Sequence, residues 1–226
     1  MVGLLSKAGR IIIPWLGPIA AGLAIVADLV GHRPAFLLLK PLATLLFMLP
    51  LFFVSGETDL LLSRFKMGML TGLAFCLLGD VFLMYQGYFV HGLASFLAGH
   101  LLFAFSFIGL KGFSPHKGSF LLIFGTGAAI FLWLRPDLGS FMLPVALYVL
   151  VISFMAWQGL GLYIREPIRA FGWIALGALF FMFSDTLIAI SKFKAPFYLS
   201  GTLVLGTYWL SLGLLTHATR RLVSRA

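Results

Sequence analysis

The chain has 226 residues, of which 61% are hydrophobic and 10% are charged, whereas an average soluble domain carries about 25% charged residues. This composition, with a mean hydropathy of +1.07, excludes a soluble globular protein and indicates an integral membrane protein. The net charge of +9 does not indicate nucleic acid as a partner, because the basic residues lie in short loops and terminal segments, where anionic membrane lipids account for them.

Apolar runs of membrane-spanning length follow one another along the whole chain. A helix needs about 20 predominantly apolar residues to cross the hydrocarbon core, and these runs lack the alternation of a membrane β-strand. No polar segment is long enough for a separate soluble domain. We therefore predict a single transmembrane domain over residues 1–226, an all-α bundle of about eight helices. The predicted spans are Ile11 to Val30, Phe36 to Val54, Gly68 to Tyr85, Phe89 to Leu110, Ser119 to Leu134, Phe141 to Gly161, Ala170 to Ile190 and Phe197 to His217.

The distribution of basic residues predicts an orientation in the membrane. Eight spans put both termini on one side, and that side carries eleven of the 16 Lys and Arg residues. The opposite side carries four, and Lys40 stands inside the second span. Cytoplasmic sides of membrane proteins are enriched in Lys and Arg, so we predict cytoplasmic termini. The short loops and compact length favour the inner membrane of a bacterium.

Two aspartates stand inside these apolar runs. Asp80 lies in LAFCLLGDVFLM and Asp185 in ALFFMFSDTLIA, within the third and seventh spans. A carboxylate in hydrocarbon costs several kcal/mol unless it faces a bundle interior or a water-filled cavity, so it indicates a functional site. When two carboxyl groups share one apolar pocket, one stays protonated near neutral pH while the other ionises. The pair then supplies a general acid and a general base. The alternative is a structural role, such as pairing with Lys40.

The two aspartate segments also suggest an internal repeat. Their spans are four apart and run in the same direction, and Gly72 and Gly177 each precede the aspartate by eight residues. This is the pattern of a four-plus-four parallel duplication, which would place the carboxyl groups across a pseudo-two-fold axis.

Four further polar residues are candidates for substrate binding: Lys40, His91, His100 and Tyr208. In the predicted orientation they lie in the outer half of the membrane or at its middle, as do both aspartates, so we expect one polar pocket there. Each has an alternative interpretation. Lys40 could extend to the interface, His91 could be solvated, His100 could be a hydrogen-bonded core residue, and Tyr208 could anchor its helix.

Several kinds of catalytic site are not indicated. The chain lacks a G-x-S-x-G motif, an H-E-x-x-H motif and a phosphate-binding glycine loop. Its five histidines are scattered, and its single cysteine, Cys76, lies in an apolar run, so no metal-ligand spacing is evident. We expect neither a metal nor a cofactor, and hydrolysis by paired carboxylates fits the residues best.

Five short motifs occur in a familiar order. They are Lys40-Pro41, LLGDVFLM (Leu77 to Met84), FVHGLASFLAGH (Phe89 to His100), GALFFMFSDTLIA (Gly177 to Ala189) and Thr207-Tyr208. In this combination the chain resembles the YhhN-like lysoplasmalogenase family of multi-pass membrane proteins.

The resemblance implies a membrane hydrolase that needs no cofactor. Its lysophospholipid substrate would be a lysoplasmalogen, with ethanolamine or choline in the headgroup. Cleavage of the vinyl ether bond would release a fatty aldehyde and glycerophosphoethanolamine or glycerophosphocholine. By motif, Asp80 and Asp185 resemble the catalytic pair, and Lys40, His100 and Tyr208 resemble pocket residues.

Two other classes of function stay open from the residues alone. An intramembrane aspartyl protease also uses two aspartates on neighbouring helices, but Leu77-Leu78-Gly79-Asp80 lacks a full GxGD pattern and no YD partner precedes it. A proton-coupled transporter could use Asp80, Asp185, Lys40 and His100 as a relay.

Overall fold

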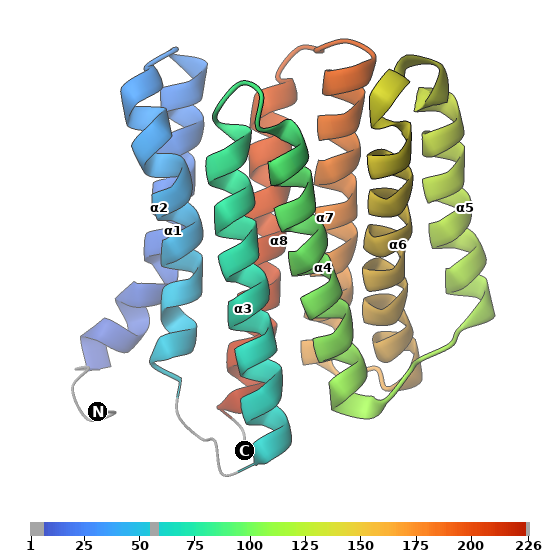
Figure 1. Ribbon diagram of the computed structural model, residues 1–226. Helices are drawn as coiled ribbons and strands as arrows, with labels where there is room; N and C mark the ends of the chain where they lie inside the picture. Colours follow the sequence, from blue (N-terminus) through green and yellow to red (C-terminus); the bar gives the residue numbers. More distant parts are fainter. Residues whose placement is uncertain (1–6, 55–58, 225–226) are drawn as a thin grey trace.

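The computed structural model describes residues 7–54 and 59–224, with side chains from Ile12 onward. The described residues form eight long helices and no strand, which confirms the predicted all-α bundle (Figure 1). The helices are α1 (Lys7–Leu29), α2 (Arg33–Phe52), α3 (Leu60–Leu83), α4 (Phe89–Lys111), α5 (Lys117–Leu134), α6 (Met142–Arg165), α7 (Arg169–Phe193) and α8 (Ser200–Val223), with the short 3₁₀ helices η1 (Arg135–Asp137) and η2 (Gly139–Phe141) between α5 and α6.

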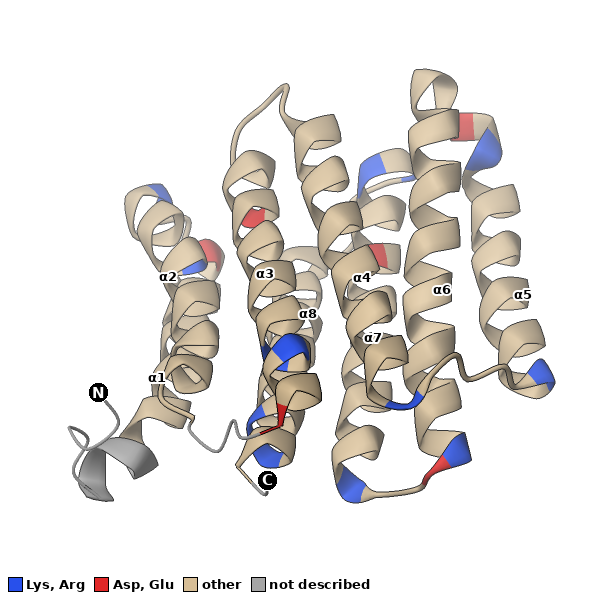
Figure 2. Ribbon diagram, turned by 60° about the horizontal axis from the view of Figure 1, so that its bottom comes forward, with Lys and Arg blue, Asp and Glu red and all other residues tan. Residues whose placement is uncertain are grey.

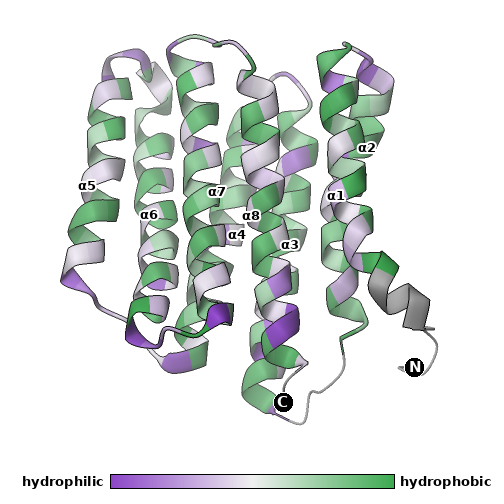
Figure 3. Ribbon diagram, turned by 180° about the vertical axis from the view of Figure 1, so that it is seen from behind, coloured by the Kyte–Doolittle hydropathy of each residue, from purple (hydrophilic) through white to green (hydrophobic). Residues whose placement is uncertain are grey.

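Seven of the described helices, α1 to α7, are long and apolar enough to cross a membrane. Figure 3 shows that hydrophobic residues predominate along them, and many large hydrophobic side chains are exposed. The predicted eighth span is also a helix of 24 residues. α8 does not reach the same hydropathy because it contains polar residues such as Ser211, Thr216 and Thr219, which the bundle buries. The chain is therefore a multi-pass membrane protein, and α8 turns polar side chains toward its interior.

The connections between helices divide the bundle into two ends (Figure 1). We call the end formed by residues 30–32, 84–88, 135–141 and 194–199 the pocket end. The opposite end holds the start of α1 and the end of α8, and Lys and Arg lie mainly toward the two ends (Figure 2). The chain termini, residues 1–6 and 225–226, lie outside the described residues, and their cytoplasmic location stays a prediction.

The packing of the helices repeats with an offset of four. α2 packs on α3, and α6 packs on α7 in the same way. The pairs α3–α4 and α7–α8 match as well, and so do α8–α2 and α4–α6. α1 and α5 flank these units on α2 and α6, although α1 also touches α8. α3 also packs on α8, whereas α7 and α4 have no interface of similar extent. The pairings thus match the predicted four-plus-four parallel duplication in part, and the duplication stays a prediction.

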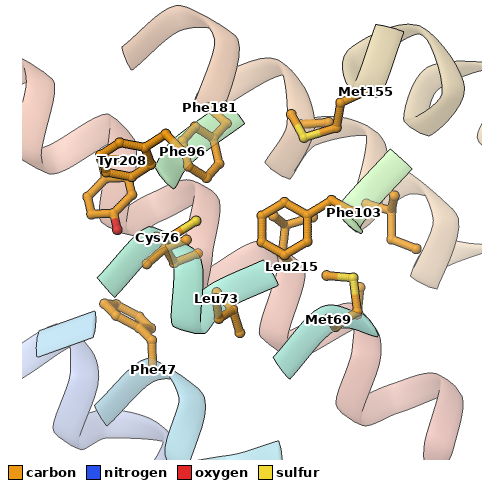
Figure 4. Packing of buried hydrophobic residues seen from close by; sticks show 14 of the residues in the cluster. Phe47, Met69, Leu73, Cys76, Phe96, Phe103, Met155, Phe181, Tyr208 and Leu215 are labelled. Carbon is orange, nitrogen blue, oxygen red and sulfur yellow. The ribbon is translucent and has the colours of Figure 1, made fainter. Parts of the chain in front are cut away.

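Glycine allows α3 and α4 to approach closely. A side chain at Gly72 would place its Cβ atom 2.4 Å from the ring of Phe103, and one at Gly99 would lie 3.0 Å from the Gly72 carbonyl oxygen. Phe103 is fully buried in the central apolar cluster, beside Leu73 and Met155 (Figure 4). This interface fixes α4 against α3 and thereby sets the position of residues one to two turns away on both helices.

We predict that Gly72→Ala destabilises the bundle. The new methyl group would overlap the Phe103 ring, which is packed on all sides, and overpacking of this kind costs about 1–3 kcal/mol. Gly109→Ala on α4 is the matched control, because a Cβ atom there meets nothing within 4 Å. Thermal unfolding of the purified variants in detergent measures the difference, and equal stability of the two variants would contradict the packing argument.

Candidate active site

Asp80 lies on α3 and is only 1% exposed. Its Oδ2 atom accepts hydrogen bonds from Thr44 Oγ1 on α2 at 2.6 Å and from the Tyr208 hydroxyl on α8 at 2.7 Å. Its Oδ1 atom is 3.6 Å from Lys40 Nζ, which also donates to the Asp80 carbonyl oxygen at 3.4 Å. Trp209 Nε1 donates to Thr44 Oγ1 at 3.4 Å. The buried carboxylate thus has a cation and two hydroxyl donors.

Asp185 lies on α7 in a different environment. Its Oδ2 atom accepts a short hydrogen bond from the Tyr148 hydroxyl on α6 and lies 3.7 Å from His100 Nε2 on α4. His100 is fully buried, and neither of its ring nitrogens has a hydrogen-bond partner among the described residues. Among the described residues no Lys or Arg forms an ion pair with Asp185, whose polar neighbours are a phenol and an imidazole.

An aromatic cluster joins the two carboxyl environments. Phe96 and Phe181 pack against Tyr208 with ring centroids 5.8 and 5.5 Å apart, and Figure 4 shows these three rings together. Phe181 also packs on His100 at 4.5 Å, and His100 packs on Tyr148 at 5.4 Å. A continuous row of rings therefore leads from the partner of Asp80 to the partners of Asp185.

The two environments follow the internal repeat. Asp80 on α3 takes its partners from α2 and α8, and Asp185 on α7 takes its partners from α6 and α4. An offset of four helices converts one set into the other. The two aspartates therefore have the same pattern of neighbouring helices, while the partner residues differ.

A polar cavity of about 530 Å³ opens at the pocket end. Helices α1, α2, α7 and α8 and the α3–α4 connection form its wall. Its charged lining residues are Asp28, Arg33, Lys40 and Lys192. Asp80 does not line the cavity itself, but Lys40, which does, contacts its carboxylate.

A narrow apolar crevice of about 60 Å³ lies beside the polar cavity, between α4, α5, α6 and α7. Asp185 and Tyr148 stand in its otherwise mostly aliphatic and aromatic wall. Leu83, Phe89 and Ile188 line both the crevice and the polar cavity. The two spaces are therefore neighbours, one apolar and reaching Asp185, the other charged and reaching Lys40.

The predicted site residues fall into three groups. Lys40 and Tyr208 lie at Asp80, and His100 lies at Asp185. His91 stands apart from both, because its side chain is exposed and its ring lies against Phe82 and Tyr88, with centroids 5.7 and 5.3 Å apart.

Sequence reasoning missed Thr44 and Tyr148. Thr44 had a usable signal, because it follows Lys40 by one helical turn and so shares its face. Tyr148 had none beyond being a hydroxyl in an apolar run. The described part of the chain contains no cluster of three His, Cys, Asp or Glu residues that could hold a metal ion.

Comparisons with known proteins agree on one family. The sequence model of the YhhN family matches residues 35–219. Lysoplasmalogenase TMEM86A of Bos taurus is 34% identical over 189 residues, which are 80% of this chain and 67% of the relative. Lysoplasmalogenase TMEM86B of Homo sapiens is 33% identical over 63% of this chain and 59% of its own length. A lysoplasmalogenase of Mycobacterium tuberculosis is 32% identical over 46% of this chain and 41% of its own length. No solved structure matches the chain.

We predict that Lys40→Met lowers the free energy of unfolding by about 3–5 kcal/mol, because it leaves the Asp80 carboxylate buried without a counter-charge. The double variant Lys40→Met/Asp80→Asn should recover most of this loss, since the amide is neutral and still accepts from Thr44 and Tyr208. Lys117→Met, at an exposed position at the start of α5, is the control. Unfolding in detergent measures all four proteins, and a double variant as unstable as Lys40→Met would contradict a charged pair.

Proposed function

The chain belongs to the YhhN family, and on this basis we propose that it hydrolyses the vinyl ether bond of lysoplasmalogens. The products would be a fatty aldehyde and glycerophosphoethanolamine or glycerophosphocholine. Relatives named lysoplasmalogenase in mammals and mycobacteria support an ether-bond hydrolase. The seven apolar helices fit a substrate that resides in a membrane.

The observation that carries the proposal is that the apolar crevice and the polar cavity adjoin each other, with Asp185 in the wall of the crevice and Asp80 in contact with Lys40 of the cavity wall. A lysoplasmalogen has one hydrocarbon chain and one charged headgroup, and its vinyl ether bond joins the two. With the hydrocarbon chain toward the crevice and the phosphate toward Arg33 and Lys192, the bond would lie near Leu83 and Phe89, which line both spaces. The crevice is narrow, so a bound chain would enter it only in part or widen it.

The surroundings of the two carboxyl groups support different roles for them. Asp185 lines the apolar crevice and has a phenol and an imidazole as partners, so we assign it the general acid. Asp80 faces Lys40 and two hydroxyl donors, which stabilise a negative charge, so we assign it the ionised carboxylate. The division matches the acid and base pair used in glycoside hydrolysis, which also passes through an oxocarbenium ion.

The reaction then follows from ordinary vinyl ether chemistry. Asp185 gives its proton to the terminal carbon of the C=C–O unit, and the remaining cation is shared between carbon and the ether oxygen. Water from the polar cavity adds to the cationic carbon and passes a proton to Asp80. The resulting hemiacetal collapses to the aldehyde and the glycerol hydroxyl. A proton returned from Asp80 to Asp185 restores the starting state.

The protease and transporter alternatives have no support among the relatives described above. They also predict different products. A protease would cut a transmembrane peptide, and a transporter in detergent would make no product from a lysoplasmalogen.

We predict that Asp185→Asn and Asp80→Asn each lower the rate of aldehyde release at least about 100-fold, as expected for loss of a general acid or base. Reduction of the aldehyde by alcohol dehydrogenase with NADH provides the assay. Asp137→Asn, which changes the same charge in the α5–α6 connection, should retain the wild-type rate. A rate above about a tenth of wild type in both active-site variants would exclude the paired-aspartate mechanism.

Tyr148→Phe should lower kcat about tenfold or more with little change in KM, because the Tyr148 hydroxyl orients Asp185 without being needed to bind the lipid. The matched control is Tyr163→Phe on the same helix, near its opposite end and away from both cavities. Steady-state kinetics with a purified lysoplasmalogen distinguishes the two variants. An unchanged kcat in Tyr148→Phe would remove this hydroxyl from the mechanism.

A further inference from the structure

Asp28 is a carboxylate that the catalytic proposal does not use. It lies in the last turn of α1 and lines the polar cavity. It forms no ion pair and its side chain makes no hydrogen bond with any other residue that the structure describes. It also precedes residues 35–219, the part of the chain that matches the family. Its side chain is exposed, so it is accessible to a ligand that enters the cavity.

The opposite wall of the cavity leaves space for this carboxylate. A side chain at Gly201, in the first turn of α8, would place its Cβ atom 2.8 Å from Asp28 Oδ2. That separation is shorter than a carbon–oxygen contact allows, so any larger residue at position 201 would push Asp28 aside. Gly201 lines the same cavity and leaves room for the carboxylate beside α8.

Three cations share the cavity with Asp28, and each is held differently. Lys40 is engaged by Asp80. Arg33 donates one hydrogen bond to the Met84 carbonyl oxygen at 2.8 Å, which anchors its guanidinium and leaves other N–H groups for a ligand. Lys192 lies over the Phe89 ring, 5.1 Å from its centroid. Arg33 and Lys192 can therefore meet an anion from α2 and from α7.

The cavity thus offers cations for a phosphate and one isolated carboxylate for a positive group. A headgroup that is only anionic would use the cations and would be repelled by Asp28. A zwitterionic headgroup satisfies both, because its phosphate and its ammonium lie a few atoms apart. A primary ammonium suits a carboxylate better than a quaternary one, since it donates hydrogen bonds.

We propose that Asp28 binds the ammonium group of a phosphoethanolamine headgroup whose phosphate is held by Arg33 and Lys192. The inference rests on the proposed function for the lipid nature of the ligand, and it adds the residue that recognises the headgroup. Asp28 selects among lysophospholipids and takes no part in the cleavage of the ether bond.

Binding of saturated ether lipids tests the proposal without any turnover. The probes are 1-O-hexadecyl-glycerophosphoethanolamine and 1-O-hexadecyl-glycerophosphate, which differ only in the ammonium-bearing group and have no vinyl ether to cleave. Calorimetric titration in a neutral detergent gives their affinities for the wild type and for Asp28→Asn. We expect Asp28→Asn to bind the ethanolamine lipid about tenfold more weakly and to bind the phosphate lipid equally well or better.

Asp137→Asn serves as the charge control, because Asp137 is at the same end of the bundle, pairs with Lys194 and does not line the cavity. It should leave both affinities unchanged. The proposal is overturned if Asp28→Asn binds the ethanolamine lipid as tightly as wild type, or if it weakens both lipids equally. Failure of the proposed function would appear separately, as an absence of aldehyde release from a lysoplasmalogen by the wild type.

Discussion

The structure depends on the burial of two carboxyl groups in an apolar bundle. A carboxyl group at this depth must find hydrogen-bond donors or a cation inside the protein, because lipid provides neither. Asp80 takes its partners from α2 and α8, and Asp185 takes its partners from α4 and α6. Each aspartate therefore fixes the rotation of two neighbouring helices, and six of the eight helices are positioned in this way.

The two carboxyl groups lie on helices that are four apart in the chain. Several helix pairings recur with the same offset, and Asp80 stands on α3 and Asp185 on α7, as the predicted duplication requires. The partners are not equivalent, however. Lysine and threonine on α2 face Asp80 where Tyr148 on α6 faces Asp185, and Tyr208 on α8 stands opposite Asp80 where His100 on α4 stands near Asp185. Among the described residues, these unlike partners give Asp80 a cation and Asp185 none.

The sequence carried the parts of this arrangement that depend on composition and spacing. Hydropathy was sufficient for the first seven spans, and the cost of a charge in lipid was sufficient to single out Asp80 and Asp185. The partners depend on how each helix is rotated about its axis, which periodicity cannot resolve where almost every position is apolar. Tyr148 was missed for that reason. His91 was a candidate because it is a polar residue in the predicted outer half of the membrane. In the structure its ring is exposed and packs against Phe82 and Tyr88, away from both aspartates.

The proposed reaction needs two conditions that conflict with each other, and the neighbouring apolar crevice and polar cavity can meet both. Protonation at carbon needs an acid that is shielded from water, since water would otherwise take the proton, whereas the cation that forms must then meet a water molecule. A single apolar cavity would exclude that water molecule. In a single polar cavity, water would compete with the substrate for the proton of the acid. In this structure the two requirements are met in different places. Asp185 lies in the wall of the apolar crevice, and Lys40 lies in the wall of the polar cavity. An aromatic row with Phe96 and Phe181 at its middle lies between the partners of Asp80 and those of Asp185, so the direct path from one carboxyl group to the other is apolar.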